Sequence, residues 1–322
     1  MTVSAPSHRT QFLVITCTLA LLVAVPVVAA SGLGHAEAKP GGGMAFSDPS
    51  ARPSGQLSAA IPGVEALAAP VAPAPRTGLA QAAVDAAQGA AAGATELAVA
   101  VLDRETGELA LGARGGEPYY TASLSKVLVA VDILDRRRLD GLAVADADIT
   151  LLNRALGPSD DNAMNALWSR FDGVGGIGRV SSRVGLTGTT GPRDPSQWGE
   201  VSMSAEDTVR TWRYLLEDMP AADRDLLASA MEAAPARAAD GFNQAFGLLA
   251  PAVDGPDAPG AVAKQGWMCC FSGKYYIHST GAVGGDRRFL MALLARVPRA
   301  PGWEAARQEM TRIATAAVQA TA

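Results

Sequence analysis

Apolar residues recur along this chain at spacings that predict helices and strands from about residue 77 to the C-terminus. Both ends of this region contain strand-like alternation, and a long stretch between them has helical spacing. The predicted elements, in order, are a helix at 79–92, strands at 96–103 and 109–113, a helix at 123–138, further helices to about residue 232, strands at 261–268, 274–282 and 288–297, and a helix at 303–320. This order predicts an α+β domain with a five-stranded antiparallel sheet covered by helices.

The first 76 residues do not follow these patterns. Residues 12–28 form an uncharged apolar run, followed by small residues that suit signal cleavage, so residues 1–30 are predicted to be a signal peptide or an uncleaved N-terminal anchor. Cys17 lies too early in the run for a good lipoprotein box. Residues 31–76 are rich in Pro, Gly and Ala and predict a disordered linker, either a tether or a dispensable leader. We therefore expect an extracytoplasmic protein, secreted or attached to a membrane through residues 12–30.

The composition argues against several classes of protein. The 322 residues are 48% hydrophobic and 18% charged, which excludes a wholly disordered chain. A net charge of −5 argues against a nucleic-acid partner. Only one of the three histidines, His278, lies in the predicted domain, and no HExxH motif occurs, so no metal or cofactor is predicted. The chain has 23 arginines but only four lysines. Of these two residue types, only lysine readily becomes neutral when its side chain is buried.

The two cysteines of the predicted domain are adjacent. Cys269 and Cys270 could form only a vicinal disulfide with each other, and the favoured alternative is two inert thiols buried on a strand. A disulfide framework is excluded.

Two residues at the start of the helix at 123–138 suggest nucleophilic catalysis. Ser123 and Lys126 are three positions apart, so their side chains lie on one helical face. A helix N-terminus favours developing negative charge, and a neutral lysine can accept a hydroxyl proton. The pair alone is a weak signal, because serine is a common helix cap.

Two further motifs follow in order. Ser159-Asp160-Asp161 opens another predicted helix, and Lys264-Gln265-Gly266 lies on the first of the late strands. With the Ser-x-x-Lys pair, they resemble the three motifs of the serine β-lactamase and penicillin-binding protein (D,D-peptidase) superfamily. Residues 77–322 look most similar to class A β-lactamase-like serine hydrolases.

The resemblance implies a three-layer α/β/α domain with a five-stranded antiparallel sheet and a trimmed all-helical subdomain. It also implies that Ser123 is the acylated nucleophile, Lys126 its base and Ser159 a proton relay. Lys264 would hold a substrate carboxylate and disfavour a second positive charge on Lys126. The substrate-binding residues would be Asp161, Gln265, Gly266 and Trp267, with the N–H groups of Ser123 and Trp267 forming an oxyanion hole.

The sequence departs from the family pattern at several positions. Asp161 replaces the usual Asn, and its carboxylate would favour the Lys126 ammonium unless it points away or Asn162 takes its place. Gln265 replaces a hydroxyl residue. Only 36 positions separate Ser123 from Ser159, so the helical part is shortened. No loop matches the one that positions the deacylating water, and Glu200 is more readily explained as a surface residue than as a base.

These features predict a monomeric, exported serine hydrolase that acts by acyl-enzyme chemistry on a carboxylate-bearing amide, peptide or ester, such as a cell-wall peptide or a β-lactam-like compound. The alternatives are a catalytically weak or inactive penicillin-binding-like domain and a true β-lactamase.

Two other signals are interpreted as structural. Residues 173–178 fit GxGxxG, but a helix precedes them, so we expect a loop between two helices rather than a dinucleotide site. No G-x-S-x-G motif accompanies His278, which we expect to make a local hydrogen bond.

Overall fold

The computed structural model describes residues 76–251, 253, 261–300 and 302–322. The predicted export segment at 1–30, and all of the predicted linker except residue 76, lie outside the described residues. Within the described part of the chain, no helix combines the length and the apolar character needed to cross a bilayer.

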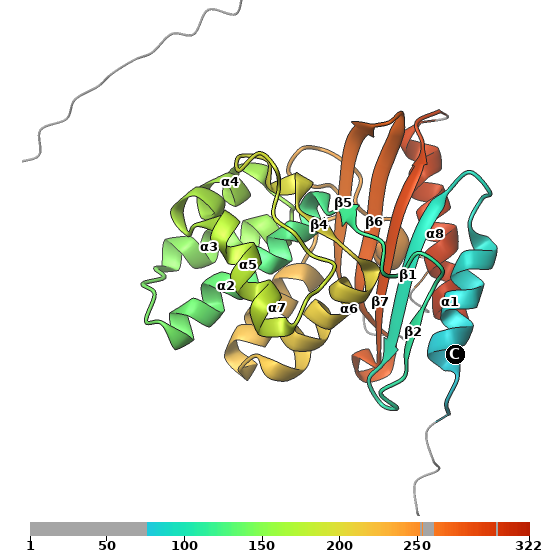
Figure 1. Cartoon of the computed structure of the whole chain (residues 1–322), viewed down its shortest axis with the longest axis horizontal. Coiled ribbons are helices and arrows are strands. Elements are labelled where there is room, and N and C mark those ends of the chain that lie inside the picture. Colours follow the sequence, from blue (N-terminus) through green and yellow to red (C-terminus); the bar gives the residue numbers. More distant parts are fainter. Residues whose placement is uncertain (1–75, 252, 254–260, 301) are drawn as a thin grey trace, which may run out of the picture. The chain divides into compact units, whose positions relative to one another are not determined.

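A five-stranded antiparallel sheet forms the centre of the domain (Figure 1). Its spatial order is β2-β1-β7-β6-β5, so strands from both ends of the domain pair in the middle. The strands are β1 Glu96–Asp103, β2 Leu109–Leu111, β5 Val262–Phe271, β6 Lys274–Val283 and β7 Phe289–Pro298. The predicted α+β sheet is thus confirmed, and β5, which carries the Lys264 motif, is an edge strand.

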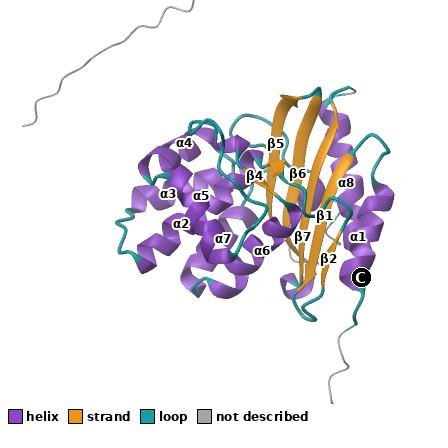
Figure 2. Cartoon of the chain, viewed as in Figure 1, coloured by secondary structure: helices purple, strands orange, loops and turns teal. Residues whose placement is uncertain are grey.

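Helices cover both faces of the sheet (Figure 2). The terminal helices α1 and α8 pack together on one face over an apolar cluster that includes Val99, Ile277 and Leu293. On the other face, a larger cluster joins the sheet to the helical part of the chain and includes Leu128, Leu134 and Trp212. The helices are α1 Leu79–Ala90, α2 Ser125–Leu139, α3 Asp146–Leu156, α4 Asp161–Arg170, α5 Gly173–Val184, α6 Ala205–Arg213, α7 Ala221–Glu232 and α8 Trp303–Gln319. A two-stranded sheet of β3 (Tyr119–Tyr120) and β4 (Ser202–Met203) lies beside them.

The glycine-rich stretch at 173–178 is helical, so the expected loop is wrong. Asp172 caps α5 by accepting a hydrogen bond from the Gly175 N–H. A Cβ on Gly173 would lie 2.2 Å from the Trp168 ring, and one on Gly176 would lie 3.0 Å from the Asp132 carboxylate. These glycines allow α5 to pack closely against its neighbours.

Candidate active site

The candidate nucleophile lies on a short turn just before α2. The helix starts at Ser125, two residues later than predicted, and Ser123 is the middle residue of a 3₁₀ turn at Ala122–Leu124. Ala122 has a φ of 47°, a left-handed conformation that costs roughly 1–2 kcal/mol for a residue with a Cβ. The surrounding structure holds this strained backbone in place, since the Thr121 N–H donates to the Val201 carbonyl at 2.7 Å. Strain of this kind is typical of functional sites.

A continuous hydrogen-bond chain joins the four predicted catalytic side chains. Lys126 Nζ lies 3.0 Å from Ser123 Oγ and 3.1 Å from Ser159 Oγ. Lys264 Nζ donates to the same Ser159 oxygen at 2.8 Å. The structure therefore brings together residues up to 141 positions apart in the sequence, in the order Ser123, Lys126, Ser159, Lys264.

The contacts of Lys126 suit a neutral amine. Its Nζ also contacts the Ser159 carbonyl oxygen and Asp161 Oδ1, each at 2.7 Å, and both atoms only accept hydrogen bonds when Asp161 is ionised. A neutral amine has two N–H groups for these two acceptors and one lone pair for the Ser123 hydroxyl. Both forms have three hydrogen-bonding positions for four oxygen partners, but only the neutral amine can accept a proton from serine.

Burial and charge act in opposite directions on Lys126. Its side chain is fully buried, and desolvation lowers its pKa, whereas the Asp161 carboxylate raises it; the net direction is downward. Burial also lowers the pKa of Lys264 well below its ordinary value, and repulsion from Lys126 lowers it further. Desolvation rather than the Lys264 charge is thus the main cause of the shift at Lys126.

Two adjacent carboxylates at the start of α4 have different roles. Asp160 caps the helix, accepts hydrogen bonds from the N–H groups of Asn162 and Ala163, and pairs with Arg154. Asp161 faces Lys126 instead, so it neither points away nor leaves its place to Asn162. The departure noted in the sequence is therefore a direct ion pair with the candidate base, although the Asp161 side chain is 58% exposed and water weakens the pair.

The edge strand β5 approaches the Ser123 turn closely because of Gly266. A Cβ at this position would lie 2.8 Å from the Thr121 carbonyl oxygen. The next residue, Trp267, lines the cleft beside Ser123 and stacks on Phe242 with ring centroids 4.6 Å apart. The oxyanion hole formed by the N–H groups of Ser123 and Trp267 stays a prediction that this close approach favours.

Two predicted substrate contacts need correction. Gln265 is fully buried, and its amide donates to the Phe246 carbonyl on the α8 side of the sheet, because alternate residues of a strand point to opposite faces. It does not line the cleft. Lys264 is only 1% exposed, and its Nζ donates to Ser159 Oγ and the Gln265 carbonyl. It therefore supports the hydrogen-bond chain and is not among the described residues that line the cavity.

Ser123 opens into a cavity of about 410 Å³, which is at the small end of the range for ligand pockets. The lining residues are Ala122, Ser123, Asp161, Asn165, Ser196, Gln197, Trp198, Gly199, Asp240, Trp267 and Met268. The Trp198 indole donates to Asn165 Oδ1 at 2.7 Å and its ring lies 4.9 Å from Lys126 Nζ, so it forms the wall above the base.

Asp240 is a charged cleft residue that the sequence analysis does not single out. It lies in a tight turn in which the Gly241 N–H donates to the Ala238 carbonyl, and Gly241 has a φ of 85°. The Asp240-Gly241 pair is a recognisable turn signal. Nothing local indicates that this turn lies beside Ser123.

Two other sequence expectations can be compared with the structure. His278 makes the expected local contacts: its Nε2 bonds the Tyr120 carbonyl at 2.8 Å, while Nδ1 accepts from the Ala295 N–H. Cys269 is exposed and Cys270 is half-buried, so the expectation of two buried thiols is wrong.

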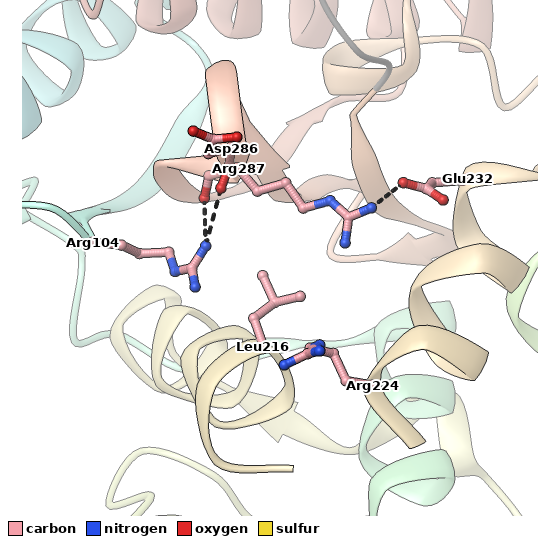
Figure 3. A pocket seen from close by; sticks show the side chains of 6 residues that line it. All are labelled: Arg104, Leu216, Arg224, Glu232, Asp286 and Arg287. Carbon is pink, nitrogen blue, oxygen red and sulfur yellow. Dashed lines mark hydrogen bonds and ion pairs between the residues drawn. The ribbon is translucent and has the colours of Figure 1, made fainter. Parts of the chain in front are cut away.

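A second cavity of about 410 Å³ lies elsewhere in the domain (Figure 3). Its arginines already have partners: Arg104 pairs with Glu217 and bonds two backbone carbonyls, and Arg287 pairs with Glu232. Its lining includes no serine, cysteine or lysine.

Comparisons with known proteins were made at the levels of sequence and structure. No family model matches the chain. Proteins named "Putative lipoprotein LppW" from Mycobacterium tuberculosis (strain ATCC 25618 / H37Rv) and Mycobacterium bovis (strain ATCC BAA-935 / AF2122/97) are each 34% identical over 215 residues. The matched stretch spans 66% of this chain and 66% of each relative.

Similar solved structures are β-lactamases. The TLA-1 extended-spectrum β-lactamase has a TM-score of 0.62 at 11% identity, covering 75% of this chain and 98% of that one. A class A β-lactamase from Mycobacterium abscessus has a TM-score of 0.56 at 16% identity, covering 75% and 98% respectively. A β-lactamase from Chitinophaga pinensis has a TM-score of 0.58 at 16% identity, covering 76% and 99%. The chain therefore has the same fold as these β-lactamases.

Proposed function

We propose that this protein is an exported serine hydrolase that transfers acyl groups from an amide, peptide or ester through a covalent intermediate on Ser123. The observation that carries the proposal is the hydrogen-bond chain from Ser123 through Lys126 and Ser159 to Lys264, at the floor of a cleft. The LppW relatives, named lipoproteins, support a location outside the cytoplasm.

The reaction can be written from these contacts. Neutral Lys126 Nζ takes the proton of the Ser123 hydroxyl, 3.0 Å away, as Oγ attacks the carbonyl carbon. When the bond from this carbon to the leaving nitrogen or oxygen breaks, the Ser159 hydroxyl gives its proton to the leaving group and takes one from the Lys126 ammonium. Water then attacks the ester, which releases the acid and restores Ser123.

The second half of the reaction is hydrolysis of the acyl-enzyme, and few groups in the cleft could activate the attacking water. Among the described lining residues, only Asp161 and Asp240 carry a carboxylate. Asp161 is paired with Lys126, and Glu200 does not line the cavity. No carboxylate among the described lining residues contacts Ser123, so activation of the attacking water depends on Lys126, and the acyl-enzyme should persist, which suits a peptidase, transpeptidase or esterase better than a fast β-lactamase.

Covalent labelling tests the proposal. The purified protein is incubated with a fluorophosphonate or a fluorescent penicillin, and the modified residue is identified by mass spectrometry. We expect a stable adduct on Ser123 that Ser123→Ala abolishes. Steady hydrolysis of nitrocefin would contradict the slow second step. No adduct with either reagent would overturn the proposal and support the alternative, a binding domain in which the Lys126–Asp161 ion pair keeps the base protonated.

Asp161→Asn is expected to speed labelling of Ser123. The Asp161 charge raises the pKa of Lys126, so its removal increases the neutral fraction of the base at neutral pH. Because Asp161 is 58% exposed, we expect a gain of roughly fivefold rather than the larger effect of a buried pair. The measurement is the labelling rate against pH, whose rise should move to lower pH.

The matched control is Asp225→Asn, which removes an exposed carboxylate on α7, away from the cleft. It should leave the rate and its pH profile unchanged. A slower Asp161→Asn enzyme would show that the carboxylate assists acylation.

A further inference from the structure

The charge that the cleft presents to a substrate is negative. Two carboxylates line the cavity, from Asp161 and Asp240, and no lysine or arginine is among the lining residues that the structure describes. Lys126 and Lys264 lie beneath the floor, each 1% exposed, and their Nζ atoms are engaged by protein oxygens. A bound molecule therefore meets carboxylates, not ammonium groups.

The two carboxylates are not equivalent. Asp161 accepts a hydrogen bond from Lys126, whose Nζ is 2.7 Å from its Oδ1. Asp240 forms no salt bridge with any residue in the described part of the chain. It is exposed at the cleft, and its charge acts on the buried Lys126 and Lys264 through space, without a hydrogen bond to either.

The fold also fixes the position of Asp240. Its Oδ1 accepts a hydrogen bond from the Phe242 N–H at 2.8 Å, and its Oδ2 accepts one from the Trp267 indole at 3.2 Å. Trp267 is itself held by stacking on Phe242, whose ring packs edge-on against Phe246 and Trp303. Each carboxylate oxygen is held by one hydrogen bond, so the group is preorganised to face a cation in the cleft.

We propose that Asp240 is a specificity-determining residue of this cleft and selects acyl donors that carry an ammonium group. The inference rests on the proposed function, because it names the substrate class for acyl transfer at Ser123. It replaces the carboxylate-bearing substrate expected from sequence, whose recognition depended on Lys264.

The test uses three fluorophosphonates with one linker and different ends: trimethylammonium, its neutral isostere tert-butyl, and carboxylate. The rate of Ser123 modification is measured by intact-protein mass spectrometry at neutral pH and low salt. We expect the cationic probe to react roughly fivefold faster than the tert-butyl probe, and the carboxylate probe to react most slowly. The ratio of cationic to neutral rates should approach one in Asp240→Asn.

The control is Asp286→Asn, which removes the same charge from the second cavity (Figure 3) and should preserve the wild-type ratio. Added salt supplies a second readout that needs no variant, because screening should reduce the ratio in the wild-type protein. Equal rates for the three probes, or the fastest rate with the carboxylate probe, would overturn the role of Asp240 and leave the serine hydrolase intact. Failure of all three to modify Ser123 would instead refute the proposed function.

Discussion

Lys126→Met is expected to slow the labelling of Ser123 by about a thousandfold, the typical effect of losing a general base. Methionine keeps the length and apolar stem of this buried side chain and removes the one nitrogen that contacts the Ser123 hydroxyl. The freed Asp161 carboxylate is 58% exposed and can be hydrated, so the fold should tolerate the change. The measurement is the rate of fluorophosphonate modification.

Lys274→Met provides the matched control. Lys274 pairs with Glu96 and does not line the cleft, so its loss should leave the labelling rate unchanged. If Lys126→Met reacts at nearly the wild-type rate, another group activates Ser123 and the Ser123–Lys126 contact has no role in catalysis.

The stability of the protein is expected to fall by about 3 kcal/mol between pH 7 and pH 4 through His278 alone. Complete burial lowers the pKa of His278 from 6.5 to about 4 in the folded state. Between these values the unfolded chain binds a proton that the folded protein does not. The contribution of the neutral ring is therefore complete above the unfolded pKa and is lost as the pH falls toward 4.

Chemical denaturation of the wild-type protein and His278→Gln at several pH values measures this effect. Glutamine retains a donor for the Tyr120 carbonyl but does not titrate. Carboxylates whose pKa is lowered by arginine partners, such as Asp103 and Asp160, contribute equally to both proteins and cancel. Parallel stability curves would show that His278 takes up its proton without unfolding.

The sequence predicts those parts of the site that depend on local spacing or on the family pattern. Ser123 and Lys126 meet because they are one helical turn apart, and β5 places Lys264 beside Ser159 as the resemblance implies. The strand order also follows, since the alternating segments at both ends of the domain must pair to cover their apolar faces.

Features that depend on long-range packing could not be predicted from the sequence. The glycines at 173–178 belong to a helix because they pack against Trp168 and Asp132, contacts that no local pattern reveals. Gln265 turns away from the cleft because the pleat of β5 directs Lys264 inward. Asp240 reaches the site only because its turn packs on Trp267, whose indole donates to it.

The pairing of β1 with β7 has a consequence for when activity can begin. During synthesis, Ser123, Lys126 and Ser159 emerge long before the strand that bears Lys264 and the two strands that connect it to β1. A nascent or C-terminally clipped chain thus has a nucleophile without the wall that must face it. Acyl-transfer activity should therefore begin only when the final strands join the sheet. Incomplete products of translation should be inert toward the same probes.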